Sequence, residues 1–291
     1  MKLAFIVQGH KNPAQIARLA RRLACEEARV YVHVSAVSSG LDRAVRSQLR
    51  NTRNVEFVDS KPMYWNSWTF VRAIMRSLRQ ALDSGYPFDY VVLLTGQDYP
   101  ILGKSAMAAH FERARGKSFL LHDKLPLAEW ESGGLDRFRN LHLVVPTHLP
   151  GREPLRMTLK PIRERCLPSG FELWGGGGYW GLSRNHVLHL VRTVDDTPQL
   201  ERLFRYCAVP DELFFHTVLL STLPQSEFIR QSTSFVVWDR PTGPWPAILK
   251  TSDFQRVVSS GHPLARKFDV TVDEGILDML DERAGEARPS I

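Results

Sequence analysis

The stretch "FDYVVLLTGQDYPI", residues 88–101, carries the strongest fold signal in the chain. An unbroken apolar run at residues 90–94 leads directly into the turn Thr95-Gly96-Gln97-Asp98. A short apolar run without polar alternation is typical of a strand that helices cover on both faces, as in parallel sheets. The stretch therefore predicts a buried strand that ends in a polar turn.

The rest of the N-terminal half alternates between strand and helix patterns. Short apolar runs predict strands at residues 2–8, 30–34 and 55–59, and apolar side chains at helical spacing predict helices at residues 14–24 and 68–82, the first after a cap-like Asn12-Pro13. This alternation favours an α/β fold with a Rossmann-like mixed sheet flanked by helices. Ligands of such sheets bind beyond the carboxyl ends of the strands. We therefore expect His10, Ser35 and the turn at residues 95–100 to share one rim that binds a nucleotide.

The C-terminal half is less regular. Residues 132–168 are rich in Pro, Gly, Arg and Leu without a clean period, and we interpret them as an insertion that faces an acceptor. Helical patterns return at residues 185–194 and after residue 209, and the polar tail at residues 281–291 is expected to fray. We predict one domain over residues 1–273, divided into a nucleotide-binding half (1–122) and an acceptor-binding, catalytic half (123–273), with a C-terminal helix and tail at 274–291.

Composition excludes several classes of protein. The chain has 291 residues, 43% of them hydrophobic, and no apolar run approaches the roughly 18 residues of a membrane span. Its N-terminus reads as a strand instead of a signal peptide. The three cysteines, Cys25, Cys166 and Cys207, are far apart and form no C-x-x-C pair, so the sequence favours a reducing cytoplasm.

The net charge of +7 favours anionic partners. No nucleic-acid-binding signature accompanies it, so we expect no nucleic acid partner. Basic residues recur at helical spacing at Arg18, Arg21, Arg22, Arg43, Arg46, Arg50 and Arg53. They are interpreted as a solvated helix face, with peripheral attraction to the inner face of an anionic membrane as the alternative.

Two neighbouring acids, Asp211 and Glu212, precede the apolar run in "VPDELFFHTVLLS", residues 209–221. Both would be favoured by a helix dipole in a first turn, and this explanation is sufficient by itself. The alternative is that Glu212 is a rigidly held general base. A metal pair of Glu212 with His216 is also open, although two ligands at that spacing often occur by chance.

The glycine run in "GGGGYWGLSR", residues 175–184, is not a phosphate-binding P-loop, because no Lys-Ser or Lys-Thr follows it. Gly177 and Gly178 beside Tyr179 and Trp180 suggest backbone close to a flat ligand, with aromatic faces for stacking on a sugar. A tight turn with core aromatics is the alternative.

Arg266 and Lys267 precede the apolar Phe268, and cations in that position would neutralise a diphosphate leaving group. A solvated pair at a strand edge is the alternative. No Asp-x-Asp motif occurs in the chain to hold a divalent metal.

Four ordered motifs identify a family resemblance. They are "FDYVVLLTGQDYPI", "GGGGYWGLSR", "PDELFFHTVLL" and "LKTSDFQRVVSSGHPLARKFD". In this order and at these intervals they resemble glycosyltransferase family 14, the core-2/I-branching β-1,6-N-acetylglucosaminyltransferases and peptide O-xylosyltransferases. The likeness extends to about residue 273, and the N-terminal half looks like the bacterial members. The resemblance implies a GT-A fold, an inverting reaction and no metal or other cofactor.

The resemblance also assigns roles to residues. Glu212 matches the catalytic base, Lys267 a lysine that contacts the diphosphate, and Asp98 a turn near the donor. A second family cation is replaced here by Ser234, so Arg240 is the substitute candidate. The full donor set is Gln8, His10, Asp98, Arg240, Arg266 and Lys267, and the sugar or acceptor pocket is Gly177, Gly178, Tyr179, Trp180 and Asp211.

The sequence thus predicts an inverting, metal-independent glycosyltransferase. We expect it to transfer GlcNAc from UDP-GlcNAc to a hydroxyl of a glycan or lipid-linked glycan in bacterial surface polysaccharide synthesis. Its location would be cytoplasmic or peripheral at the inner face of the membrane. The alternatives are a UDP-xylose-dependent enzyme of the same family and a non-catalytic nucleotide- or sugar-binding module.

Overall fold

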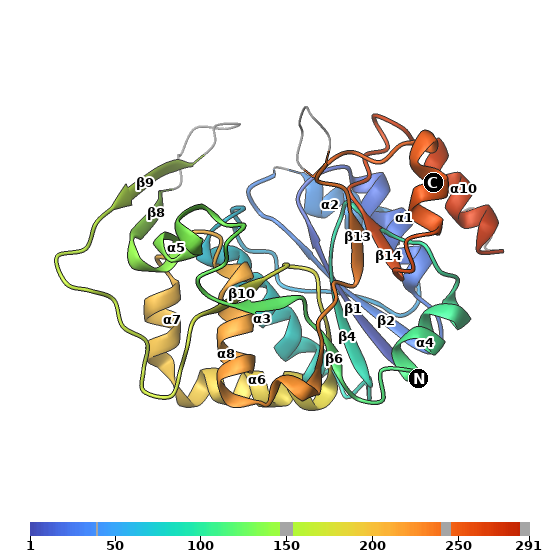
Figure 1. Ribbon diagram of the computed structural model, residues 1–291. Helices are drawn as coiled ribbons and strands as arrows, with labels where there is room; N and C mark the ends of the chain where they lie inside the picture. The colour runs from blue at the N-terminus through green and yellow to red at the C-terminus, as the bar shows by residue number, and fades with distance from the viewer. Residues whose placement is uncertain (39, 146–153, 240–245, 286–291) are drawn as a thin grey trace.

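The computed structural model describes residues 1–38, 40–145, 154–239 and 246–285 (Figure 1). The helices are α1 (Pro13–Leu23), α2 (Leu41–Leu49), α3 (Trp68–Asp83), α4 (Lys104–Glu112), α5 (Asp136–Arg139), α6 (Arg184–Asp196), α7 (Pro198–Phe204), α8 (Phe214–Thr222), α9 (Phe254–Val258) and α10 (Gly275–Arg283). The strands are β1 (Leu3–Gly9), β2 (Ala28–Val34), β3 (Val55–Phe57), β4 (Tyr90–Thr95), β5 (Asp98–Pro100), β6 (Ser118–Phe119), β7 (His122–Lys124), β8 (Leu141–Val145), β9 (Leu155–Leu159), β10 (Trp174–Gly176), β11 (Gly181–Ser183), β12 (Phe228–Ile229), β13 (Ser234–Val236) and β14 (Leu264–Arg266).

A seven-stranded mixed sheet forms the centre, in the order β12-β6-β11-β4-β1-β2-β3. The four strands β1 to β4 run parallel, whereas β11 is antiparallel to both of its neighbours. Every residue of β1 and β4 is buried, which explains why both read as unbroken apolar runs. The predicted Rossmann-like mixed sheet with flanking helices is confirmed.

Two hydrophobic cores lie on opposite faces of this sheet. Alternate residues of β1 point into different cores. Ala4 and Ile6 belong to the core under α3, α6 and α8. Leu3, Phe5 and Val7 belong to the core under α1, α2, α4 and α10. Figure 1 shows the two helical layers on either side of the strands. The period-2 separation is the geometry of a strand with its faces on two different cores.

Helix α10 docks onto α1 through buried ion pairs. Arg18 contacts Asp281 at 2.8 Å and Asp278 at 2.7 Å, and Arg22 contacts Asp281 at 2.9 Å. Tyr99 donates its hydroxyl proton to the same Asp281 carboxylate. The expectation of a solvated basic face is therefore wrong for Arg18 and Arg22, because α10 brings carboxylates from about 260 residues away to meet them.

The irregular segment at residues 132–168 contains α5 and the antiparallel pair β8–β9. Asn12 precedes α1 as expected, but its side chain forms no cap; it donates to Asp269 at 3.0 Å. Within the described ranges no helix is long and apolar enough to cross a bilayer. The predicted boundary at residue 273 stays a prediction.

Candidate active site

The carboxyl ends of β1, β2 and β4 meet at one rim. The backbone N–H of Ser35 donates to the carbonyl of Gly9 at 2.9 Å, and that of Gly96 donates to Gln8 at 3.0 Å. A Cβ at Gly9 or Gly96 would lie 2.8 Å from the side chain of Ile16, so glycines are needed for α1 to approach the strand ends this closely. The predicted sharing of the rim by His10, Ser35 and the turn after β4 is confirmed.

Asp98 organises the turn beyond β4. Its fully buried carboxylate accepts from the Thr95 N–H at 2.7 Å, from the Thr95 hydroxyl at 2.6 Å and from the Ser234 hydroxyl at 3.2 Å. Strand β14 pairs with β5 so that Arg266 lies opposite Asp98, and their side chains form an ion pair at 3.5 Å. Asp98 therefore positions Arg266, while its own oxygens are occupied by protein groups.

The Arg266 guanidinium is buried but incompletely paired. It lies 4.0 Å from the centre of the Tyr179 ring, and only 3% of the residue is exposed. Its Nε and Nη1 have no hydrogen-bond acceptor among the described residues. Buried donors of this kind normally have partners, so an anionic oxygen of a ligand would complete the site.

Lys11, Arg266 and Lys267 form a cationic cluster beside His10. The pKa of Lys267 is lowered, mainly by partial burial and to a lesser extent by the positive charges of Lys11 and Arg266. The pKa of His10 is lowered to about 4, first by burial and then by the positive charges of Lys11, Lys267 and Arg266. Asp269 pairs with Lys11 at 2.6 Å. Three cations against two acids, Asp269 and the Asp98 that pairs with Arg266, leave a net positive rim that suits a diphosphate.

Lys11 was missed by the sequence reasoning. Lys11 follows His10 directly after the first strand, and a cation at this position could have been predicted to lie at the nucleotide-binding rim. Gln8 lies beneath the rim, 1% exposed, and donates to Ser77 of α3 at 3.3 Å. Arg240 lies outside the described residues.

Asp211 and Glu212 lie in a single 3-10 turn, Pro210–Glu212, just before α8. No side chain caps this turn or α8 by a hydrogen bond, but both acids lie in the first turn, so the helix-dipole explanation stays open. Burial raises the pKa of Asp211, and the nearby charge of Glu212 raises it further. Burial also raises the pKa of Glu212. Oδ1 of Asp211 has no partner among the described residues. The pKa values of these two side chains, the acid pair, are thus raised above those of solvated carboxylates.

Arg137 of α5 is the principal partner of Glu212. Its guanidinium donates to Oε2 of Glu212 at 2.7 Å and stacks 3.7 Å from the centre of the Trp130 ring. Its charge and hydrogen bond lower the pKa of Glu212 and oppose burial. Arg137 lies in the irregular segment, where no motif in the sequence distinguished it.

The glycine run connects the acid pair to the cationic cluster. A Cβ at Gly178 would lie 3.3 Å from Oδ2 of Asp211 and 3.9 Å from Cγ of Glu212. The next residue, Tyr179, is the ring that Arg266 covers. The pKa of Tyr179 is raised, first by burial; Arg266 opposes the rise and the acid pair adds to it. One short segment therefore contacts both charged groups.

Trp180 corrects one expectation. It is 0% exposed and packs against Phe215 with ring centres 5.4 Å apart, so its ring lies in the core and presents no face to a sugar. Its position next to β11, which pairs with the central β4, explains the burial.

His216 is buried in α8, and its side chain contacts the backbone. Its Nε2 donates to the carbonyl of Leu121 at 3.0 Å, and burial lowers its pKa to about 3. The described residues contain no group of three or more His, Cys, Asp or Glu side chains that could hold a metal ion. Independence of a metal stays a prediction.

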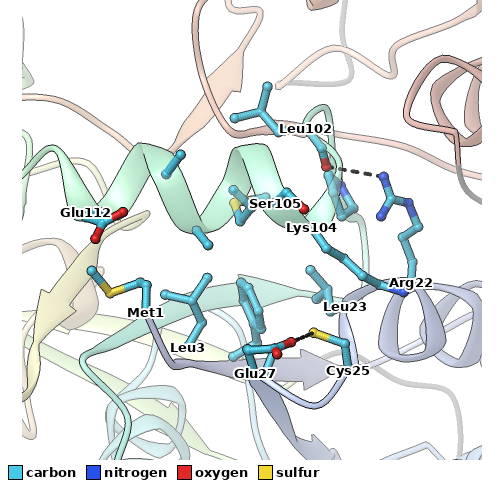
Figure 2. Close-up of a pocket in the computed structure, with 16 residues that line it drawn as sticks. Met1, Leu3, Arg22, Leu23, Cys25, Glu27, Leu102, Lys104, Ser105 and Glu112 are labelled. Atoms are coloured by element: carbon cyan, nitrogen blue, oxygen red, sulfur yellow. Dashed lines mark hydrogen bonds between the residues drawn. The ribbon is translucent and has the colours of Figure 1, made fainter.

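A cavity of about 390 Å³ lies at the other end of the sheet (Figure 2). Figure 2 shows Ser105 and Lys104 of α4 above Leu3 of β1 and the neighbouring Met1. This is the amino end of the parallel strands, where such sheets do not bind their substrates. The rim, in contrast, carries the cationic cluster and the incompletely hydrogen-bonded Arg266.

Comparison with known proteins identifies the family. The Core-2/I-Branching enzyme family matches residues 3–258, and the chain belongs to this family of glycosyltransferases. Xylosyltransferase 2 of Homo sapiens is 27% identical over 301 residues, covering 97% of this chain and 33% of the relative. Xylosyltransferase 1 of Mus musculus is 26% identical, covering 97% and 30%. The chain thus spans about a third of the length of these relatives.

Among solved structures, a mannosyltransferase from Pyrobaculum calidifontis, in complex with GDP-Man and Mn2+, is 14% identical with a TM-score of 0.32. The likeness covers 44% of this chain and 36% of that one. It carries no argument about this site.

Proposed function

We propose that this protein is an inverting, metal-independent glycosyltransferase that moves GlcNAc from UDP-GlcNAc to a hydroxyl of a glycan acceptor. The observation that carries the proposal is the arrangement of two incompletely paired charged groups on one segment. The acid pair lies against Gly178, and Arg266 of the cationic cluster lies over Tyr179. The acid pair is suited to accept a proton, and the cationic cluster is suited to bind a diphosphate.

The proposed reaction is a single displacement. The acceptor oxygen attacks the anomeric carbon while Glu212 takes its proton. The bond from that carbon to the UDP oxygen breaks, and UDP leaves with the bonding electron pair. Lys267, Lys11 and Arg266 stabilise the charge that grows on the diphosphate. Attack from the face opposite UDP inverts the anomeric centre.

Arg137 has a positioning role in this proposal. A base must be ionised to accept a proton, yet burial raises the pKa of Glu212. The ion pair at 2.7 Å favours the ionised form and fixes the direction of the carboxylate. The Trp130 ring holds the guanidinium in turn.

Transfer of xylose from UDP-xylose is the second candidate, and the names of the similar xylosyltransferases favour it. The acceptor is proposed to be a glycan or lipid-linked glycan of a bacterial surface polysaccharide, reached from the cytoplasmic side of a membrane. A binding module without catalysis is the remaining alternative.

A donor screen tests these proposals. UDP release would be measured with UDP-GlcNAc, UDP-xylose, UDP-glucose and UDP-galactose in the presence of mixed glycan acceptors. We expect UDP-GlcNAc to give the highest rate. A clear preference for UDP-xylose would replace the first candidate by the second, and tight UDP-sugar binding without any turnover would favour the binding module.

A further inference from the structure

The antiparallel hairpin β8–β9 has one wholly apolar face. The paired residues are Leu141 with Leu159, Leu143 with Met157, and Val145 with Leu155. Directly opposed residues at every second position lie on the same face of a two-stranded ribbon. Val145, Leu155, Met157 and Leu159 are 46%, 56%, 44% and 44% exposed. We call these six side chains the hairpin face.

The opposite face of the hairpin holds it to the protein. His142 contacts the Asp136 carbonyl at 3.1 Å, and Arg156 donates to the Trp65 carbonyl at 2.7 Å. Leu143 and Val145 of the hairpin face also line a pocket of about 320 Å³ together with Trp68 of α3 and Tyr206. The part of the face that is most open to solvent is therefore β9, with Leu155, Met157 and Leu159. None of the six side chains of the hairpin face belongs to either hydrophobic core in the described structure. Figure 1 shows the hairpin projecting beyond α5, on the side of the molecule opposite α10.

Basic residues continue from the hairpin face. Lys160 and Arg163 are exposed, with the fully exposed Ile162 between them. Apart from Arg156 on the opposite face, residues 154–163 contain the cations Lys160 and Arg163 and no acid, and the exposed Glu164 follows them. Exposed apolar side chains that lie together beside charged residues are typical of an interaction site, and the neighbouring positive charge favours an anionic partner.

We propose that the hairpin face and the adjoining Lys160, Ile162 and Arg163 dock onto an anionic phospholipid bilayer. Apolar side chains enter the boundary between headgroups and acyl chains, while lysine and arginine pair with anionic headgroups. A second copy of the chain fits less well, because an interface of the hairpin with itself would bring the same cations of both copies together.

Docking at this surface would also present an acceptor to the active site. The hairpin follows α5 in the chain, and α5 carries the Arg137 that contacts Glu212. This step rests on the proposed function: a glycan attached to a membrane lipid would emerge beside the acid pair. Membrane binding itself requires no turnover.

Vesicle flotation tests the proposal with the full chain. Vesicles of phosphatidylglycerol and phosphatidylcholine would be compared with phosphatidylcholine alone. The apolar variant is Met157→Ser with Leu159→Ser, and the charge variant is Lys160→Glu with Arg163→Glu. The matched controls are Leu188→Ser on α6, 43% exposed, and Arg50→Glu with Arg53→Glu, which remove equal charge from the exposed end of α2.

We expect the wild type and both controls to float with anionic vesicles and not with phosphatidylcholine alone. Neutralising one headgroup-facing cation weakens membrane partitioning by about fivefold, so the charge variant should lose binding at least by that factor. All variants should bind UDP like the wild type, because none of the altered residues belongs to the donor set, and flotation is measured without turnover, which keeps this test separate from the proposed function.

Three outcomes would overturn the proposal. The wild type does not bind anionic vesicles; binding is lost in the α2 control instead of the hairpin variants; or sedimentation shows a concentration-dependent dimer that Met157→Ser with Leu159→Ser abolishes. Vesicle binding by the hairpin in a protein that turns over no UDP-sugar would refute the proposed function alone.

Discussion

Two buried charged clusters in this molecule differ in how completely they are paired. At the junction of α1 and α10, Asp281 accepts from Arg18, Arg22 and Tyr99, and Arg18 also contacts Asp278 and Glu274. At the rim, two nitrogens of Arg266 and one oxygen of Asp211 lack hydrogen-bond partners among the described residues. Burial of unpaired polar atoms is costly, and a ligand that pairs with them would remove this cost. The first cluster stabilises the fold, and the second suits a substrate.

The largest effect is expected at Glu212. Glu212→Gln keeps the shape of the side chain but removes its ability to accept a proton. Turnover should fall by roughly 10²- to 10⁴-fold, the usual contribution of a positioned base. UDP release with saturating donor measures this fall in turnover. A variant with wild-type turnover and a lower melting temperature would make Glu212 a purely structural residue.

The second-largest effect on transfer is expected at Lys267. Lys267→Ala removes a cation that no described acid pairs with directly, so its loss should be felt by the diphosphate. Transfer should fall by about 10²- to 10³-fold, together with UDP affinity. Lys267→Arg should retain only part of the transfer rate and UDP affinity, because a planar guanidinium does not replace a compact ammonium. Unchanged UDP affinity in Lys267→Ala would remove Lys267 from the donor site.

Asp281 supplies the contrast on the structural side. Asp281→Ala leaves Arg18 and Arg22 buried without their shared partner, and breaking such a set costs about 3–5 kcal/mol of unfolding free energy. Denaturant unfolding measures this loss, while turnover well below the melting temperature should stay near wild type. Selective loss of turnover with intact stability would contradict the division between the two clusters.

Arg137 should give a smaller, pH-dependent effect. Its positive charge lowers the pKa of Glu212, so Arg137→Ala should raise that pKa and move the acidic limb of kcat/KM to higher pH. Activity on this limb would fall by about tenfold for every unit that the pKa of Glu212 rises, and it would recover as pH rises. Arg137→Lys should restore much of the profile. An equal loss at every pH would indicate a role in folding or acceptor binding instead.

Removal of metal is expected to have no effect. Transfer should continue in EDTA, because side-chain cations are proposed to meet the diphosphate charge. An assay with and without EDTA, followed by Mn²⁺, measures this directly. Activity that EDTA abolishes and Mn²⁺ restores would contradict the proposal.

Local patterns in the sequence were enough for the parallel half of the fold. The runs in β1 and β4 and the periodicity of α3 are local, and the rim follows from the rule for parallel sheets. The pairing of Arg18 with Asp281 and of Arg137 with Glu212 depends on residues 263 and 75 positions apart, which no local pattern encodes. Trp180 was misread for the same reason, since only strand pairing decides that it is buried.

The central claim is that the cationic cluster binds the nucleotide and the acid pair performs the proton transfer. Calorimetric titration of UDP into Glu212→Gln and Lys267→Ala, alongside turnover of the same preparations, tests it most directly. We predict that Glu212→Gln binds UDP like the wild type and scarcely turns over, whereas Lys267→Ala loses both. If Glu212→Gln loses UDP affinity while Lys267→Ala retains it, the two roles have been assigned to the wrong groups.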